Sequence, residues 1–162
     1  MTNREFFLQR FEAETPATLR VFRAIPAEKL DWRPHARSRS AGELVGLLVY
    51  ELETGIELCQ SGQINWNESA AKVGPLEEMI AAFQRHTKTL TEHLRRLDDA
   101  TWNRKAQFLV RGMPVLEETI GDLFWIALFD AVHHRGQLSV YLRPMGGKVP
   151  SIYGPSADDP GG

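Results

Sequence analysis

The sequence predicts an all-α fold, a four-helix bundle with an extended C-terminal tail. Four segments carry apolar residues at helical spacing, capping residues or prolines mark their ends, and strand-like alternation is scarce. Together these observations favour four amphipathic helices that share one core. A chain of 162 residues is most simply one domain, 1–162, within which residues 155–162 are expected to be flexible.

The first helix is expected to begin at Thr2, a good N-cap residue, and to run to about Ala24. Pro16 lies inside this segment and is expected to bend or interrupt the helix, because proline lacks the N–H group that the helix needs. Residues 27–39 then form a connecting loop that is rich in arginine.

Capping patterns mark the second and third helices. Ser40 and Glu43 have the spacing of a capping box, so the second helix begins there, and Gly62 ends it. Pro75 is favourable at a first helical position and opens the third helix, which ends near residues 98–99.

A connector over residues 102–114 leads to the fourth helix. This connector could contain a short extended piece. The fourth helix is expected over Leu116–Arg143 and ends at Pro144. Residues 149–155 are too rich in proline for a helix but apolar enough to dock on the bundle.

Composition and charge exclude several partners. A formal net charge of -2 with scattered arginines gives no reason to expect nucleic acid. No segment approaches the roughly 20 apolar residues of a membrane span, and residues 1–7 do not resemble a signal peptide. A single cysteine, Cys59, excludes an intrachain disulfide. We therefore expect a cytoplasmic protein that binds neither nucleic acid nor membrane.

Polar residues interrupt the apolar faces of two helices. Asp130 and His134 are spaced by four residues on the fourth helix, and Glu51 lies within the apolar face of the second. Burying such polar groups without a partner costs free energy of folding. They could hold a divalent metal and leave a fourth position open, as in catalytic sites. These three ligands are compatible with zinc, nickel, iron or manganese, and they do not distinguish among these metals. Alternatively, Asp130 pairs with His134 or an arginine, and Glu51 bonds to a loop.

Neighbouring residues suggest further roles. His133 lies beside the apolar face of the fourth helix that holds Asp130 and His134, and it is the nearest candidate for catalytic proton transfer. Gln137 could orient His134 or Asp130 from the next turn. Arg135 and Arg143 are candidate anchors for an anionic group of a small-molecule substrate.

The fourth helix also carries apolar residues away from the face that holds Asp130 and His134: Phe124, Trp125, Leu128 and Phe129. A helix that is apolar on several sides must be covered by its own domain or by another subunit. We expect a homodimer; the alternative is that the C-terminal tail covers this side.

Residues 133–138 (HHRGQL), 141–143 (YLR) and 149–154 (VPSIYG) closely resemble the last helix and tail of the DinB family, also described as DinB/YfiT-like metalloenzymes. Residues 40–51 are similar to the second helix of that family. The resemblance implies a four-helix bundle, often dimeric. It also implies a divalent metal held by three histidines, one on the second helix and two spaced by four on the last. Some family members are thiol-dependent transferases or isomerases.

Residue by residue, the resemblance implies an altered ligand set. His134 matches the last histidine, but Asp130 replaces the histidine before it and Leu47 replaces the one on the second helix. Leucine cannot bind a metal. Glu51 lies one helical turn from Leu47 on the same face and could take its place. Three functions remain: a divalent-metal-dependent enzyme of the hydrolase or thiol-transferase kind, a metal-free module that binds a small ligand or a partner protein, or a purely structural dimer module.

Overall fold

The structure, a computed structural model, describes residues 1–161. Its four long helices are α1 (Asn3–Arg23), α2 (Ala41–Ser61), α3 (Leu76–Arg96) and α5 (Ile120–Leu142). Short helical turns η1 (Ala27–Lys29), η2 (Glu68–Ala70) and α4 (Asp99–Trp102) lie between them. Three strands, β1 (Gln63–Trp66), β2 (Lys105–Val110) and β3 (Met113–Thr119), complete the described elements.

Local sequence explains where the helices begin and end. The side chain of Ser40 accepts a hydrogen bond from the Glu43 amide and Glu43 returns one to Ser40, so the predicted capping box of α2 is confirmed. Gly62 ends α2 in a left-handed conformation, with φ of 74°. Pro16 lies within α1 without interrupting it, because the helix continues to Arg23.

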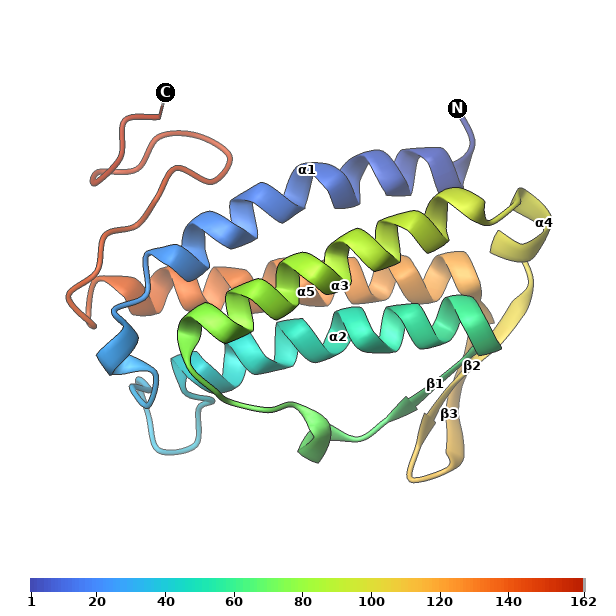
Figure 1. The fold of residues 1–162 in the computed structure, drawn as a ribbon, viewed down its shortest axis with the longest axis horizontal. Coiled ribbons are helices and arrows are strands. Elements are labelled where there is room, and N and C mark those ends of the chain that lie inside the picture. The colour runs from blue at the N-terminus through green and yellow to red at the C-terminus, as the bar shows by residue number, and fades with distance from the viewer. Residues whose placement is uncertain (162) are drawn as a thin grey trace.

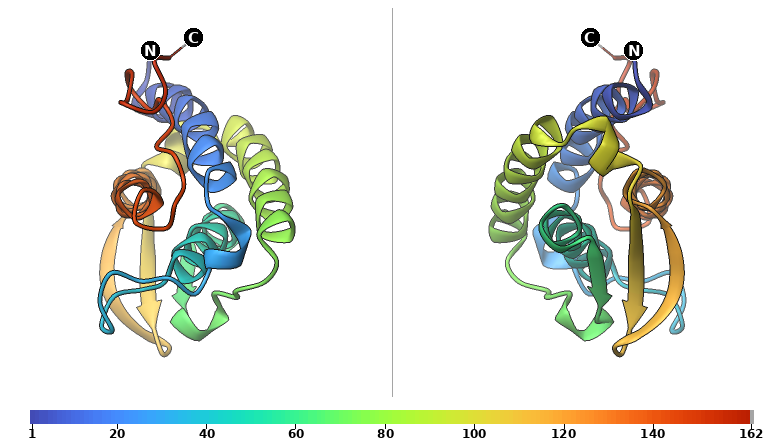
Figure 2. Two further views of the ribbon diagram at one scale, coloured as in Figure 1. Left: turned by 90° about the vertical axis from the view of Figure 1, so that its left-hand side faces the viewer. Right: turned by 90° about the vertical axis from the view of Figure 1, so that its right-hand side faces the viewer.

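The four long helices form a bundle in which α1 and α2 each pack against both α3 and α5 (Figures 1 and 2). Helices α2 and α3 run in the same direction, so the segment between them returns along the length of the bundle (Figure 1). The core between the helices is apolar, with Phe22, Leu48, Leu94 and Leu138 at most 2% exposed. The predicted helix bundle is confirmed.

The prediction of a purely all-α fold is wrong in one respect, because the structure also contains a three-stranded sheet. Strand β1 pairs in parallel with β2, and β2 pairs in antiparallel with β3. Figure 2 shows the strands extending from the side of the bundle formed by α2 and α5.

The predicted start of the fourth helix at Leu116 is also wrong. Residues 116–119 extend β3, and the helix begins at Ile120. Thr119 is its N-cap, accepting a hydrogen bond from the amide of Asp122 at 3.0 Å. Arg111 and Gly112 both have positive φ and make the turn that folds β3 back onto β2. The pairing with β2 therefore overrides the helical spacing of the apolar residues.

The apolar sides of α5 are covered mainly by the chain itself. Phe124 and Leu128 are buried in the core, and Trp125 makes an edge contact with Phe7 of α1 at 5.1 Å between ring centroids. Phe129 differs, since 66% of its surface is exposed. Helix α1, rather than the C-terminal tail, therefore covers the second side of α5. The homodimer stays a prediction.

The C-terminal tail docks through a buried arginine on α5. Arg135 is 2% exposed, and its guanidinium donates to the carboxylate of Glu14 on α1 and to the hydroxyl of Tyr153 in the tail. Arg20 of α1 also donates to the carbonyl oxygen of Ser151, at 2.9 Å. These contacts fix the tail against α1 and α5.

The last residues of the tail also make contacts. Asp158 accepts hydrogen bonds from Arg143 and from the amide of Val149. The expected flexibility of residues 155–162 stays a prediction, and residue 162 lies outside the described residues. Within residues 1–161, no helix combines the length and the apolar character needed to cross a membrane.

Candidate metal centre

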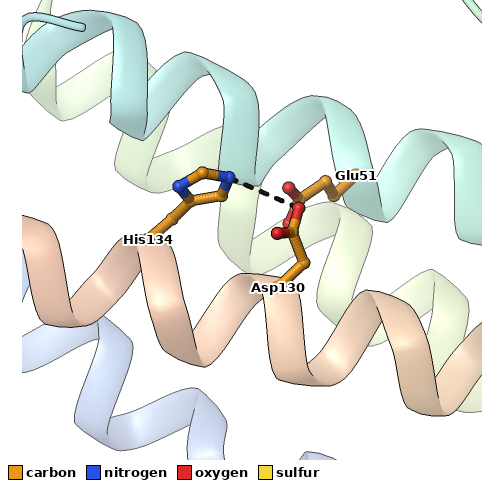
Figure 3. A group of neighbouring side chains, drawn as sticks. All are labelled: Glu51, Asp130 and His134. Atoms are coloured by element: carbon orange, nitrogen blue, oxygen red, sulfur yellow. Dashed lines mark ion pairs between the residues drawn. The ribbon is translucent and has the colours of Figure 1, made fainter. Parts of the chain in front are cut away.

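Glu51 projects from the middle of α2 into the space between α2 and α5, where it meets Asp130 and His134 (Figure 3). Its carboxylate is fully shielded from solvent, and among residues 1–161 neither oxygen has a hydrogen-bond partner. A small apolar cavity of about 60 Å³ lies beside it, lined by side chains that include Leu48 and Phe124. A carboxylate in such surroundings requires a proton or a cation.

Asp130 and His134 lie one turn apart on α5 and face each other (Figure 3). His134 Nε2 is 3.3 Å from Asp130 Oδ2. The Asp130 side chain is 52% exposed and that of His134 is 14% exposed, so the pair lies at the boundary between core and solvent. One ligand atom from each of Glu51, Asp130 and His134 lies within 4.8 Å of the other two.

Gln137 fixes the orientation of His134. Its side-chain oxygen lies 2.9 Å from His134 Nδ1, so that nitrogen carries a proton and donates it. The Gln137 amide nitrogen in turn donates to His133 Nε2 at 3.2 Å. In the neutral imidazole, this arrangement leaves the lone pair of His134 Nε2 directed at the two carboxylates. A cation between them would satisfy all three groups.

The pKa values follow from the same contacts. Burial raises the pKa of the Glu51 carboxyl well above its ordinary value, and the charge of nearby Asp130 raises it further. The hydrogen bond with His134 lowers the pKa of Asp130 despite partial burial. The same hydrogen bond raises the pKa of His134. Without a metal, these shifts favour the neutral acid form of Glu51, which can donate to ionised Asp130, and the protonated form of His134.

These residues fit a divalent transition metal. Two carboxylates and one imidazole from facing helices are a common way to build a metal site in a helix bundle. The carboxylate of Glu51 has no hydrogen-bond partner among the described residues, and the contact of His134 Nδ1 with Gln137 leaves Nε2 as the nitrogen that could bind a metal beside it. Three protein ligands would leave room for a further ligand.

An open apolar groove of about 690 Å³ runs from this cluster between α5 and the sheet. Glu51 and Asp130 lie in its wall, together with apolar side chains from the sheet and α5: Ile64, Trp66, Phe108, Val115, Leu116, Leu123, Ile126, Ala127 and Phe129. Residue spacing alone does not reveal this groove, because one of its walls is a sheet that forms between distant parts of the chain.

Several other residues are not part of the cluster. Leu47 is 2% exposed and offers no ligand atom. Arg135 and Arg143 are not free to anchor an anion, because they pair with Glu14 and Asp158. Burial raises the pKa of the Cys59 thiol to about 12, which disfavours a nucleophilic role.

Arg39 is a further functional candidate, and its sequence pattern does not reveal it. Its guanidinium pairs with Glu68, and its positive charge lowers the pKa values of Glu51 and His134, although burial of Glu51 and the Asp130–His134 hydrogen bond outweigh this effect. Its place in an arginine-rich loop gave no sign of this proximity, because loop geometry is not read from residue spacing.

Comparisons with known proteins agree on the fold. The model of the DinB family matches residues 1–161. A DinB-like protein from Bacillus cereus ATCC 10987 is 20% identical, with a TM-score of 0.75 over 92% of this chain and 97% of that one. YfiT from Bacillus subtilis, described as a probable metal-dependent hydrolase with an unusual four-helix bundle topology, is 18% identical, with a TM-score of 0.70 over 88% and 87% of the two chains.

A more distant structure extends the comparison. The mycothiol-dependent maleylpyruvate isomerase is 9% identical, with a TM-score of 0.61, and the match covers 89% of this chain and 61% of that chain. At these identities the structural matches establish the fold alone. The sequence has no match among curated proteins.

Proposed function

The chain belongs to the DinB family, and from that premise we propose that it is a divalent-metal-dependent enzyme of the hydrolase or thiol-transferase kind. Its metal would be held by Glu51, Asp130 and His134. The similarity to a probable metal-dependent hydrolase and to a thiol-dependent isomerase supports this range of reactions.

One observation carries the proposal: the buried carboxylate of Glu51 has no donor within the described part of the chain, yet it faces a second carboxylate and an imidazole. Two carboxylates this close are unfavourable when both are ionised. A divalent cation would remove that repulsion and let each ligand keep the charge state that it has in water at neutral pH.

A bound divalent ion would supply Lewis-acid polarisation of a substrate and would lower the pKa of a water molecule or thiol in the site. The protein contributes the rest. Gln137 holds the His134 ring through Nδ1, and the core around Glu51 excludes water from one side. We propose exposed His133, which accepts a hydrogen bond from Gln137 next to the cluster, as the group that exchanges protons with solvent.

The second candidate function is a metal-free module that binds a small ligand. The observation that favours it is the 3.3 Å pair between Asp130 and His134, which partly satisfies both groups without a cation. In that state a protonated Glu51 would donate to Asp130. The groove beside Asp130 would then serve binding alone.

Metal content decides between the two candidates. The protein would be purified without chelators and without a nickel column, analysed for transition metals, and then titrated with zinc, nickel, iron(II) and manganese. The first proposal expects close to one equivalent of one metal and stabilisation of about 2.7 kcal/mol when that metal is present at 100 times its Kd.

Glu51→Gln is expected to abolish both effects. Glu53→Gln, on the same helix but exposed to solvent, is the matched control and should bind metal like the original chain. Less than about a tenth of an equivalent, with no stabilisation by any of these metals, would refute the metal-dependent function and favour the binding module.

A further inference from the structure

We infer that the groove between α5 and the sheet binds the apolar body of the substrate, while the polar head of the same molecule reaches the metal centre. The substrate class is a small amphipathic molecule with an aromatic or aliphatic body and one oxygen or sulfur group that can coordinate a metal. The role of the head group rests on the proposed metal-dependent function, whereas the groove stands on its own observations.

The walls of the groove are apolar and accessible. From α5, Ile126 is 49% exposed and Phe129 is 66% exposed, and from β3, Val115 is 61% exposed. All three side chains line the groove. Large apolar side chains that gather on one exposed surface usually mark a binding site.

The aromatic part of the sheet wall is preformed. Trp66 of β1 stacks on Phe108 of β2 with 5.8 Å between ring centroids, and it also contacts Tyr50 of α2 at 5.1 Å. Tyr50 is anchored in turn, since its hydroxyl accepts a hydrogen bond from the amide of Asn67. Aromatic rings held in this way need little reordering when a ligand binds.

The charge in the groove is confined to the candidate metal ligands. Glu51 and Asp130 are the charged residues of its lining within the described chain. The hydroxyl of Thr54, also in the lining, already donates to the backbone oxygen of Glu51. A ligand that fills the groove therefore meets apolar contacts along its body and polar atoms where Glu51 and Asp130 lie.

A small molecule fits this site better than a second copy of the chain. The volume of about 690 Å³ falls within the range of small-molecule pockets, about 300–1,000 Å³. An apolar protein surface pressed into the groove would also remove water from the half-exposed carboxylate of Asp130 and offer it no partner beyond His134, which is costly. A ligand with a polar head avoids that cost.

The first experiment tests the groove without a metal. N-phenyl-1-naphthylamine, a neutral probe whose fluorescence rises in apolar sites, would be titrated into chelator-treated protein. We expect saturable binding that weakens by at least about tenfold in the double variant Ile126→Ser, Phe129→Ser. The control is Val140→Ser, which changes an exposed apolar residue of α5 that does not line the groove and should leave binding unchanged.

The second experiment tests the link to the metal centre, with metal-loaded protein and hydroxamates, whose head group coordinates metals. Octanohydroxamate should bind at least about tenfold tighter than acetohydroxamate, because each buried methylene adds about fourfold. The double variant should remove this difference without changing the affinity for acetohydroxamate or the metal content.

The outcomes separate the two proposals. Suppose that no metal binds, that apolar molecules displace the fluorescent probe, and that the double variant no longer binds the probe. The groove proposal is then supported and the metal-dependent function is refuted. The groove proposal is overturned if the probe does not bind, if Val140→Ser weakens binding equally, or if both hydroxamates bind equally to loaded protein. It is also overturned if the double variant converts a dimer to a monomer in sedimentation, since the groove would then be an interface between copies.

Discussion

Glu51 of α2 and Asp130 of α5 place carboxylate oxygens within 4.8 Å of each other, across the contact between the two helices (Figure 3). The first carboxylate is shielded from solvent and the second is half exposed. Their charges cannot both be uncompensated at this distance in a shielded site. Either a proton on Glu51 or a cation between the two residues must resolve the repulsion.

Glu51→Gln is expected to stabilise the metal-free protein at alkaline pH. Burial raises the pKa of Glu51 in the folded state above its unfolded value, so the native state binds the extra proton. The contribution of this proton to the free energy of unfolding is therefore fully present below the pKa of Glu51 in the unfolded chain. It is lost as the pH rises through the pKa of Glu51 in the folded protein. Glutamine resembles the protonated form and does not ionise. At pH 8.5 the variant should exceed the original chain by on the order of 1 kcal/mol in urea unfolding.

The control for this prediction is a second pH. The difference between the two proteins should shrink at pH 4, where both have a neutral side chain at position 51. A Glu51→Gln variant that is less stable than the original chain at pH 8.5 would mean that the ionised carboxylate has a stabilising partner in the metal-free protein.

Metal binding is expected to release protons at pH 6. The pKa values of Glu51 and His134 are both raised, so both groups keep their protons to higher pH in the metal-free state, and both must lose them to act as ligands. Affinity should therefore rise with pH. Titration calorimetry in two buffers with different ionisation enthalpies measures the release directly. Equal apparent enthalpies in the two buffers would exclude proton-coupled binding.

Gln137→Leu is expected to weaken metal binding by about 10- to 100-fold, because His134 Nδ1 loses the acceptor that fixes its tautomer and ring orientation. Ser139→Ala is a suitable control, since that hydroxyl donates to the backbone of Gly136. Competition with a chromogenic chelator measures both affinities. Equal metal affinities for Gln137→Leu and the original chain would show that Gln137 does not support the metal site.

Arg135→Ala is expected to destabilise the fold by about 3–5 kcal/mol, because it removes the cationic partner of the partly buried Glu14 carboxylate and leaves the Tyr153 hydroxyl as its remaining donor. Arg143→Ala breaks an exposed pair with Asp158 and should cost less than about 1 kcal/mol. Urea unfolding gives both values.

Release of the tail by Arg135→Ala should also expose the bond after Lys148 to trypsin, since Tyr153 loses its guanidinium partner. Similar costs for Arg135→Ala and Arg143→Ala, with equal resistance to trypsin, would contradict the role of Arg135 as the anchor of the tail.

The sequence alone predicted the features that depend on local spacing. The capping box of Ser40 and Glu43 involves neighbours in the chain, and helical periodicity placed Asp130 and His134 on one face. The meeting of Glu51 with this pair was also anticipated, because two amphipathic helices direct their interrupted apolar faces into a shared core. The metal itself stays a proposal.

Features that depend on distant parts of the chain were missed. Strands β1 and β2 pair although the whole of α3 lies between them in the sequence. No local pattern predicts the pairing of Trp66 with Val110. Leu116 fits a helical repeat, but its cross-strand neighbour Phe108 draws it into the sheet. Arg135 looked like a substrate anchor because its partner, Glu14, lies on the first helix.

The most direct measurement is an anomalous-difference map, recorded at the absorption edge of the metal, from crystals of protein purified without chelators. We predict one strong peak between Glu51, Asp130 and His134, at about 2.1 Å from His134 Nε2 and from an oxygen of each carboxylate. A map without that peak, in which Glu51 lies at hydrogen-bonding distance from Asp130, would contradict the account and identify a proton in place of the metal.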